Sequence, residues 1–373
     1  MTSLDNVDSV ICEVRNGAGW IRLNRPRAIN SLRADMVERM LDQLNRWKDD
    51  PDVALVCLEG EGEKGFCAGG DMRALYDLRN GGIEEYALRF FVAEYRMDHL
   101  IHRYPKPVAA FMNGVVMGGG VGLSIGASHR FVTDTTRWAM PEMNIGFFPD
   151  VGASYFLNRF PGFVGRYLAL TSHTIGVGDT IYLNAADCAV EPDRWEALKR
   201  EFAGRMWTAD TAREDLKTLM RAYSRKETPP SPLSSLRQQI DRHFCLGTVE
   251  EIEASLREAA NRGDEWARQT RETLLSKAPL SLKATLRLLQ EGQSKTLHEC
   301  LEMELNLSMN FMNCPDFFEG VRAVLVDKDR QPNWTFASLG QVTDADVEAL
   351  FACRWPDGDN PLRLDLTARQ HSK

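Results

Sequence analysis

One stretch decides the fold of this chain: residues 104–125, which read Tyr104-Pro-Lys-Pro-Val-Ala-Ala-Phe-Met-Asn-Gly-Val-Val-Met-Gly-Gly-Gly-Val-Gly-Leu-Ser-Ile125. The apolar run 108–112 predicts a buried strand, and three glycines, Gly118 to Gly120, precede an apolar run that can begin a helix. N–H groups at a helix N-terminus lack internal partners, and the helix dipole there favours negative charge. The joint therefore predicts either an anion cradle built from backbone amides or a tight turn packed against a neighbouring strand.

Two carboxylates follow in apolar surroundings. Glu142 lies between Pro141 and Met143, and Asp150 follows the run 147–149, Phe-Phe-Pro. A carboxylate in an apolar wall is costly to ionise, so its pKa should rise and suit a general acid or base near neutral pH. The alternatives are a surface loop for Glu142 and a helix N-cap for Asp150, ahead of a helix predicted over 151–157.

Length and composition indicate an ordinary soluble globular protein. It has 373 residues, 43% hydrophobic and 26% charged, and a net charge of -8. The negative charge disfavours nucleic acid and anionic membranes as partners, and no apolar run approaches the ~20 residues that span a bilayer. The eight cysteines form no C-x-x-C pair, which favours a reducing compartment. Residues 1–8 lack the features of a signal or transit peptide, so we expect a cytoplasmic protein.

Strands and helices alternate in the first half of the chain. The segments 10–14 and 20–23 predict a hairpin with Asn16-Gly17 at its turn, and Ser31 is a candidate cap for a helix reaching 50. Stretch 66–71, Phe-Cys-Ala-Gly-Gly-Asp, enters a further helix and mirrors the later glycine cluster. We expect an α/β fold of stacked β-β-α units over 1–195, a helical extension or linker over 196–277, and a helical C-terminal region over 278–373.

Other motifs carry weaker signals. Residues 122–126, Gly-Leu-Ser-Ile-Gly, match the G-x-S-x-G nucleophile elbow, which leaves open an α/β-hydrolase using Ser124 with His243 or His298. The turn chemistry lies earlier, at Gly118, so Ser124 is expected inside a helix. His99 and His102 are three residues apart without an evident third ligand, and we predict no metal site and no cofactor.

The two glycine segments, 66–71 and 113–120, resemble the signature segments of the crotonase (enoyl-CoA hydratase/isomerase) superfamily. Residues 141–152, Pro-Glu-Met-Asn-Ile-Gly-Phe-Phe-Pro-Asp-Val-Gly, look like its 3-hydroxyisobutyryl-CoA hydrolase branch, and so do 316–334. The resemblance spans about residues 10 to 334. It implies a crotonase-like spiral of β-β-α units with a helical C-terminal region, an acyl-CoA substrate, and a possible homo-oligomer.

The resemblance also implies the site. The amides of Gly70 and Gly119 would hold the thioester oxygen, which agrees with the glycine chemistry above. Glu142 would be the catalytic carboxylate, Asp150 would bind the substrate hydroxyl or tune Glu142, and Glu94 would contact the substrate. Coenzyme A would lie along Arg27, Ala28 and Ala68, beside Gly70.

One departure from the family is informative. Hydratases of this superfamily usually carry two catalytic glutamates, and the first would fall at Gly122, which has no side chain. We therefore expect hydrolysis of a short branched β-hydroxyacyl-CoA, most simply 3-hydroxyisobutyryl-CoA in valine catabolism. The alternatives are an enoyl-CoA hydratase or isomerase, the Ser124 hydrolase, and a non-catalytic acyl-CoA binder. Whether Glu142 attacks directly or activates water stays open.

Overall fold

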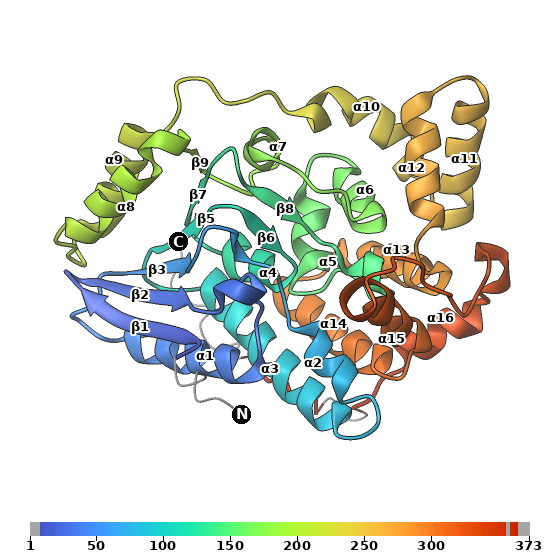
Figure 1. Cartoon of the computed structure of the whole chain (residues 1–373), viewed down its shortest axis with the longest axis horizontal. Helices are drawn as coiled ribbons and strands as arrows, with labels where there is room; N and C mark the ends of the chain where they lie inside the picture. The colour runs from blue at the N-terminus through green and yellow to red at the C-terminus, as the bar shows by residue number, and fades with distance from the viewer. Residues whose placement is uncertain (1–7, 356–358, 365–373) are drawn as a thin grey trace.

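The computed structural model describes residues 8–355 and 359–364. A six-stranded sheet in the order β1-β2-β3-β5-β7-β9 forms the N-terminal half, and its strands are parallel except for the β1–β2 hairpin. A smaller parallel sheet, β4-β6-β8, lies beside it (Figure 1). The strands are β1 Val10–Arg15, β2 Ala18–Leu23, β3 Leu55–Gly60, β4 Gly65–Cys67, β5 Val108–Met112, β6 Val115–Met117, β7 His129–Val132, β8 Arg137–Ala139 and β9 Cys188–Ala189.

The predicted repeat of two strands and a helix is confirmed. Strands β3 and β4 precede α2 (Met72–Asp77), and β5 and β6 precede α4 (Gly119–Ile125). Each unit contributes one strand to the large sheet and one to the small sheet, so the chain advances as a spiral. The glycine-rich joints of both units therefore lie where a strand of the small sheet ends.

Strand β5 is apolar throughout because both of its faces are buried. Val108, Ala110 and Met112 pack into the main core, whereas Ala109 and Phe111 point to a second core on the opposite face. The main core is covered by α1 (Ala34–Lys48) and α3 (Ile83–His102), which pack on each other. The hairpin turn is as predicted, with Asn16 and Gly17 both at positive φ.

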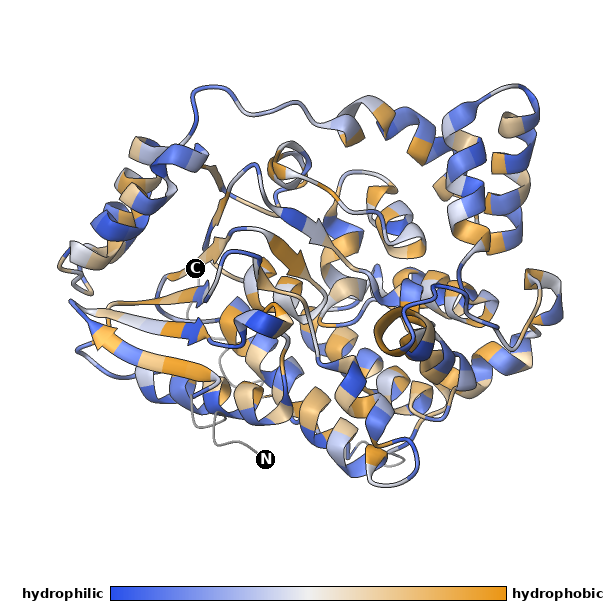
Figure 2. Ribbon diagram, viewed as in Figure 1, coloured by the Kyte–Doolittle hydropathy of each residue, from blue (hydrophilic) through white to orange (hydrophobic). Residues whose placement is uncertain are grey.

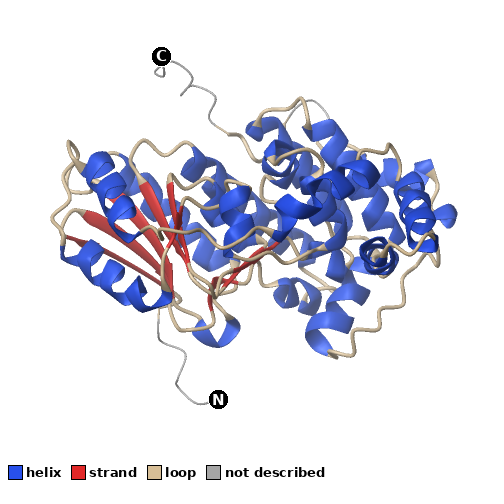
Figure 3. Ribbon diagram, turned by 90° about the horizontal axis from the view of Figure 1, so that it is seen from above, coloured by secondary structure: helices blue, strands red, loops and turns tan. Residues whose placement is uncertain are grey.

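The helices after the sheet divide into three groups (Figures 1 and 3). Helices α8 and α9 cover the second face of the sheet, where Phe111 stacks on Phe131 and meets Trp195 edge-on. Helices α10 to α12 pack against α6, and α13 to α16 enclose the rest of the main core. Their bounds are α5 Ala153–Phe156, α6 Val164–Thr171, α7 Val177–Tyr182, α8 Trp195–Gly204, α9 Ala212–Tyr223, α10 Pro232–Phe244, α11 Val249–Asn261, α12 Glu265–Leu275, α13 Pro279–Gly292, α14 Leu297–Phe311, α15 Pro315–Val321 and α16 Asp344–Phe351.

Hydropathy follows this arrangement. The strands and the inward helix faces are hydrophobic, while α10 to α12 alternate hydrophilic and hydrophobic stripes (Figure 2). That alternation is typical of helices with one face on a core and one in solvent. No helix among the described residues is long and apolar enough to cross a bilayer.

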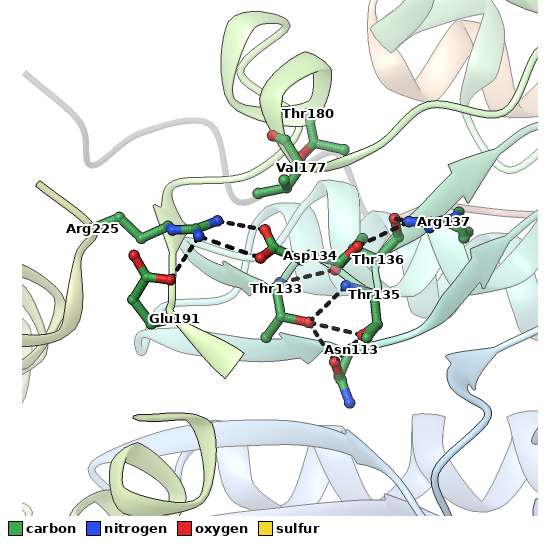
Figure 4. Close-up of polar contacts among 10 residues, drawn as sticks. All are labelled: Asn113, Thr133, Asp134, Thr135, Thr136, Arg137, Val177, Thr180, Glu191 and Arg225. Carbon is green, nitrogen blue, oxygen red and sulfur yellow. Dashed lines mark hydrogen bonds and ion pairs between the residues drawn. The ribbon is translucent and has the colours of Figure 1, made fainter. Parts of the chain in front are cut away.

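A polar network ties the sheet to the segment after α9 (Figure 4). The hydroxyls of Thr133 and Thr135 both donate to Asn113 Oδ1, at 2.5 and 2.6 Å, which fixes the turn between β7 and β8. Arg225 pairs with Asp134 and, at 2.6 Å, with Glu191. Side chains near the ends of β5 and β7 thus anchor the segment that connects α9 to α10.

One predicted helix start is wrong. Helix α1 begins at Ala34 with Arg33 as its N-cap, and Ser31 caps nothing. Instead, the guanidinium of Arg25 donates to the Ser31 carbonyl at 2.6 Å and pairs with Asp71 at 3.0 Å. Ser31 belongs to a loop that is fastened to the first glycine joint.

Candidate active site

All the residues predicted for the site line one cavity of about 670 Å³. Its walls come from distant parts of the chain: the 3-10 turns η1 (Pro26–Ala28) and η2 (Glu142–Ile145), both glycine joints, and α3. The predicted residues are Arg27, Ala28, Ala68, Gly70, Glu94, Gly119, Glu142 and Asp150. A cavity of this volume can hold only part of a ligand as large as a coenzyme, so the rest of such a ligand would extend into solvent.

The two glycine joints face each other. A methyl group added at Gly119 would lie 3.5 Å from the amide nitrogen of Gly70, and one added at Gly69 would lie 3.4 Å from that of Gly119. Gly69 and Gly118 have φ of +99° and +51°, a region that residues with a side chain rarely adopt. In the described part of the chain neither the Gly70 nor the Gly119 amide has a hydrogen-bond partner. Two unpaired donors therefore converge on one point in the cavity.

Glu142 lies in the cavity wall and is 7% exposed, so the surface-loop alternative is wrong. A methyl group at Gly118 would come within 2.7 Å of its Oε1, which places the carboxylate beside the second glycine joint. Its Oε2 is buried without a partner among the described residues. Burial, followed by the charge of Asp150, raises the pKa of Glu142 well above its ordinary value.

Asp150 is held by a tyrosine that sequence reasoning did not identify. The hydroxyl of Tyr95 donates to Asp150 Oδ2 at 2.7 Å, and the Tyr95 hydroxyl oxygen also lies 2.7 Å from Ser308 Oγ. Burial raises the pKa of Asp150 to about 7, and the Tyr95 hydrogen bond acts in the opposite direction. The alternative role as an N-cap is wrong: α5 starts two residues later than such a cap requires, after Val151 and Gly152 at positive φ.

Helix α3 supplies two buried carboxylates one turn apart, Glu94 and Asp98. Glu94 is buried, and a methyl group at Gly119 would overlap its Oε1, so its carboxylate lies against the second glycine joint. Burial, then the charges of Asp98, Asp150 and Glu142, raises its pKa well above the usual range. The spacing of four residues was the available signal for Asp98, because it puts both carboxylates on one helix face.

Asp98 lies beside Gly122, the position that corresponds to the first catalytic glutamate of the hydratases. A methyl group at Gly122 would lie 2.8 Å from Asp98 Oδ2, and neither oxygen of this carboxylate has a hydrogen-bond partner in the described chain. Burial and the charge of Asp150 raise the pKa of Asp98 well above its ordinary value. A side chain at position 122 would therefore clash with the Asp98 carboxylate, which comes from a different helix, α3.

A fifth buried carboxylate, Glu304 on α14, supports the segment after Asp150. It accepts hydrogen bonds from the Gly152 amide at 2.6 Å, the Ser154 amide at 2.9 Å and the Ser154 hydroxyl at 2.6 Å. Burial nevertheless raises the pKa of Glu304 to about 8. The C-terminal helices therefore position the chain that carries Asp150.

Cations gather at the solvent end of the cavity. Arg27, Arg73 and Lys328 line it and are exposed. The carboxylates lie in the interior of the cavity, and the basic groups lie at its mouth. A ligand with one neutral end and one anionic end would therefore bind with the neutral end inside and the anionic end at the mouth. No group of three or more His, Cys, Asp or Glu in the described residues could hold a metal ion.

Ser124 lies inside α4, as expected, and not at a turn. It is fully buried, and its hydroxyl donates to the Gly120 carbonyl at 2.8 Å. His243 is bonded instead to Ser255, at 2.8 Å. The geometry provides no nucleophile elbow at Ser124.

Comparisons with known proteins agree with this architecture. The family model for enoyl-CoA hydratase/isomerase matches residues 18–351. The chain is 36% identical to 3-hydroxyisobutyryl-CoA hydrolase, mitochondrial, of Gallus gallus, over 96% of this chain and 92% of that protein. It is 38% identical to the Danio rerio protein of the same name, over 92% and 89%.

Two solved structures are similar over nearly their whole length. One is described as a carnitinyl-CoA dehydratase from Mycobacterium thermoresistibile, with a TM-score of 0.85, 38% identity, and coverage of 94% of this chain and 98% of that one. The other is described as an enoyl-CoA hydratase from Rhodobacter sphaeroides, with a TM-score of 0.83, 36% identity, and coverage of 93% and 98%. The chain belongs to the enoyl-CoA hydratase/isomerase family, and its fold is the crotonase fold.

Proposed function

We propose that this protein hydrolyses 3-hydroxyisobutyryl-CoA to 3-hydroxyisobutyrate and free coenzyme A, the reaction of valine catabolism. One observation carries the proposal: unpaired amides of Gly70 and Gly119 converge beside Glu142, while the first hydratase position is Gly122. The relatives named as hydrolases, at 36–39% identity, support the same choice of substrate.

The amides act on the thioester oxygen. As the carbonyl becomes tetrahedral, this oxygen gains negative charge, and two preorganised donors stabilise it without reorganisation. Loss of one such donor typically costs about 3–4 kcal/mol of transition-state stabilisation, so this contribution is among the largest in the site. The Gly119 amide also lies at the start of α4, whose dipole favours negative charge there.

Glu142 delivers the attack, either by removing a proton from water or by forming a mixed anhydride with the acyl group. In both routes it must be ionised, and its raised pKa makes it a strong base when it is. The carbon–sulfur bond then breaks, and the thiolate of coenzyme A takes up the proton removed from water. In the anhydride route the thiolate leaves first, and a water molecule then cleaves the anhydride, which releases the acid, frees Glu142 and supplies the proton. Asp150 accepts a hydrogen bond from the substrate hydroxyl. Because the Asp150 and Glu142 carboxylates interact, the two titrate as a pair, and their apparent pKa values belong to the pair.

Coenzyme A extends from the cavity toward solvent. Its adenine lies near the Ala68 carbonyl, the η1 turn at Ala28 lines its chain, and Arg27 meets its phosphates. Lys328 and Arg73, at the same end of the cavity, add positive charge. No metal or cofactor takes part in the reaction as proposed.

Hydration of an enoyl-CoA is the second candidate, because the two similar solved structures are described as a dehydratase and a hydratase. Asp98 beside Gly122 offers a second carboxylate for such chemistry.

One experiment separates the two reactions. Free thiol release is measured across a panel of acyl-CoA esters, and enoyl absorbance is followed with crotonyl-CoA. The proposal predicts thiol release that is fastest with 3-hydroxyisobutyryl-CoA and an unchanged enoyl absorbance. Loss of enoyl absorbance without thiol release identifies a hydratase. No signal in either assay contradicts both the hydrolase and the hydratase reactions.

A further inference from the structure

We infer that a basic cavity between the C-terminal end of α3 and the start of α14 is a binding site for a small phosphate-bearing anion. This α3–α14 cavity has a volume of about 430 Å³. Its basic lining residues are His99, His102, Arg103, Arg159, Lys295 and His298. It shares no lining residue with the cavity around Glu142, so the inference does not depend on the proposed function.

The charge of the cavity opposes that of the protein. The chain carries -8 overall, yet three permanent cations and three imidazoles line this one cavity. None of its described lining residues is an aspartate or a glutamate. The carboxylates around it are Glu302, which lies 3.3 Å from His298 Nε2, and Glu299, whose charge interacts with Lys295. A third, Asp98, lines an adjoining cavity together with His102 and Arg159. A local reversal of sign of this kind concentrates anions from solution.

Several of the basic groups are held in fixed positions. The guanidinium of Arg159 lies 3.2 Å above the centre of the Tyr155 ring and donates to the Tyr155 carbonyl at 2.6 Å. The ring of His102 meets the same tyrosine edge-on at 5.8 Å. Because these groups are already ordered, a ligand would lose little further side-chain entropy in binding them.

Donors are available for a ligand. His298 Nδ1 is buried without a hydrogen-bond partner among the described residues, and because Nε2 faces Glu302, Nδ1 donates to a ligand when the ring is protonated. The Lys295 ammonium likewise has no hydrogen-bond or ion-pair partner in the part of the chain that the structure describes. The rings of His99 and His298 lie 6.3 Å apart, so one small anion can contact both. Planar guanidinium, point-charge ammonium and imidazole donors together suit phosphate oxygens.

The titration of the histidines agrees with this geometry. Burial, followed by the charges of Arg103, His298 and His102, lowers the pKa of His99 to about 4. Burial also lowers the pKa of His102, again with help from Arg103 and Arg159. At the start of α14 a capping box already occupies the amides of Thr296 and Glu299. The charged contacts of the ligand come from the side chains that line the cavity.

Pyrophosphate is the probe that tests the inference, with the imidazole signals of the whole protein followed by NMR. We expect pyrophosphate to raise the pKa of His99 and His102 by about 1–3 units, because an opposite charge nearby has this effect. The signals of His129, His173 and His243 serve as internal controls and should not move. Sodium chloride of equal ionic strength should leave all of them unchanged.

Two variants complete the test by isothermal titration. Lys295→Ala and Arg159→Gln should each weaken pyrophosphate binding about tenfold or more, whereas Lys217→Ala, which removes an exposed lysine on α9, should not. Equal shifts of all the imidazoles, the same shifts in chloride, or unchanged affinity in both cavity variants would each overturn the inference. Arg159→Lys, which retains the charge but not the planar fork, should bind with intermediate affinity.

Discussion

Replacing Tyr95 by phenylalanine should move the acid limb of the pH–rate profile. The Tyr95 hydroxyl donates a 2.7 Å hydrogen bond to Asp150 and is fully buried, so solvent does not weaken it. A hydrogen bond to a charged group contributes about 1.5–3 kcal/mol, and one pKa unit corresponds to about 1.36 kcal/mol. Without this donor, the pKa of Asp150 should therefore rise by about 1–2 units, from about 7 to about 8–9.

The consequence can be calculated for neutral pH. Wild type should gain activity as the pH rises through about 7, because Asp150 must be ionised to accept the hydrogen bond of the substrate hydroxyl. In Tyr95→Phe the ionised fraction at pH 7 falls from about half to about 1–10%, a loss of roughly 5–50-fold. Activity should return toward the wild-type value at about pH 9.5, which a merely structural defect would not allow.

The assay is release of free thiol from 3-hydroxyisobutyryl-CoA at saturating substrate over about pH 5.5 to 9.5. Ser308→Ala is the matched control, since it removes the other hydrogen bond of Tyr95 but leaves the donation to Asp150. It should move the limb by less than about 0.5 unit. A Tyr95→Phe profile that superimposes on wild type, or that is depressed equally at every pH, would refute the reasoning.

Two further predictions concern the glycines and the buried acids. Gly119→Ala should lower kcat by about 10²–10³-fold with little change in KM, because a methyl group there meets Glu94 and displaces an amide donor. Gly176→Ala is the control, because a methyl group there has no atom within 4 Å, and it should leave kcat unchanged. An equal loss of kcat in both variants would contradict the oxyanion role of the Gly119 amide. Raised folded-state pKa values contribute stability that is present below the unfolded pKa and lost as the pH rises through the folded one, so the free energy of unfolding should fall from about pH 5 to 8. Glu304→Gln should remove about 2–3 kcal/mol of the fall between about pH 5.5 and 7.5, measured by urea unfolding, because burial raises the pKa of Glu304 to about 8; a variant as pH-dependent as wild type would contradict this.

Local chemistry made much of the fold predictable. The run 108–112 is apolar on both faces, which only a doubly covered strand explains, and the joints at 69–70 and 118–120 need glycine to turn. The hairpin at Asn16-Gly17 follows from the same rules. These signals lie within a few residues of the features that they predict.

The support of the site was not predictable in this way. Tyr95 and Ser308 are separated by more than two hundred residues, and Glu304 reaches Ser154 from a different helix. The four-residue spacing places Asp98 on the same helix face as Glu94, but it does not show that α4 brings Gly122 against Asp98. Such contacts depend on how helices pack over long separations, which periodicity does not encode.

Ser31 and Asp150 were wrong as helix caps for a related reason. Both residue types favour the N-cap position, but tertiary contacts overrode the preference. Ser31 binds Arg25, whose guanidinium joins the η1 loop to Asp71, and Asp150 faces Tyr95. At each position a partner outside the predicted helix outweighed a local preference that contributes only ~1 kcal/mol.

The most direct test of the account is thiol release from 3-hydroxyisobutyryl-CoA by Glu142→Gln, compared with wild type and with Ser124→Ala. Glutamine preserves the size of the side chain and removes the base, so binding of the substrate should persist while kcat falls by about 10²–10⁴-fold. Ser124→Ala should retain wild-type kcat, because its hydroxyl is bonded within α4. Full activity in Glu142→Gln, or loss confined to Ser124→Ala, would contradict the account.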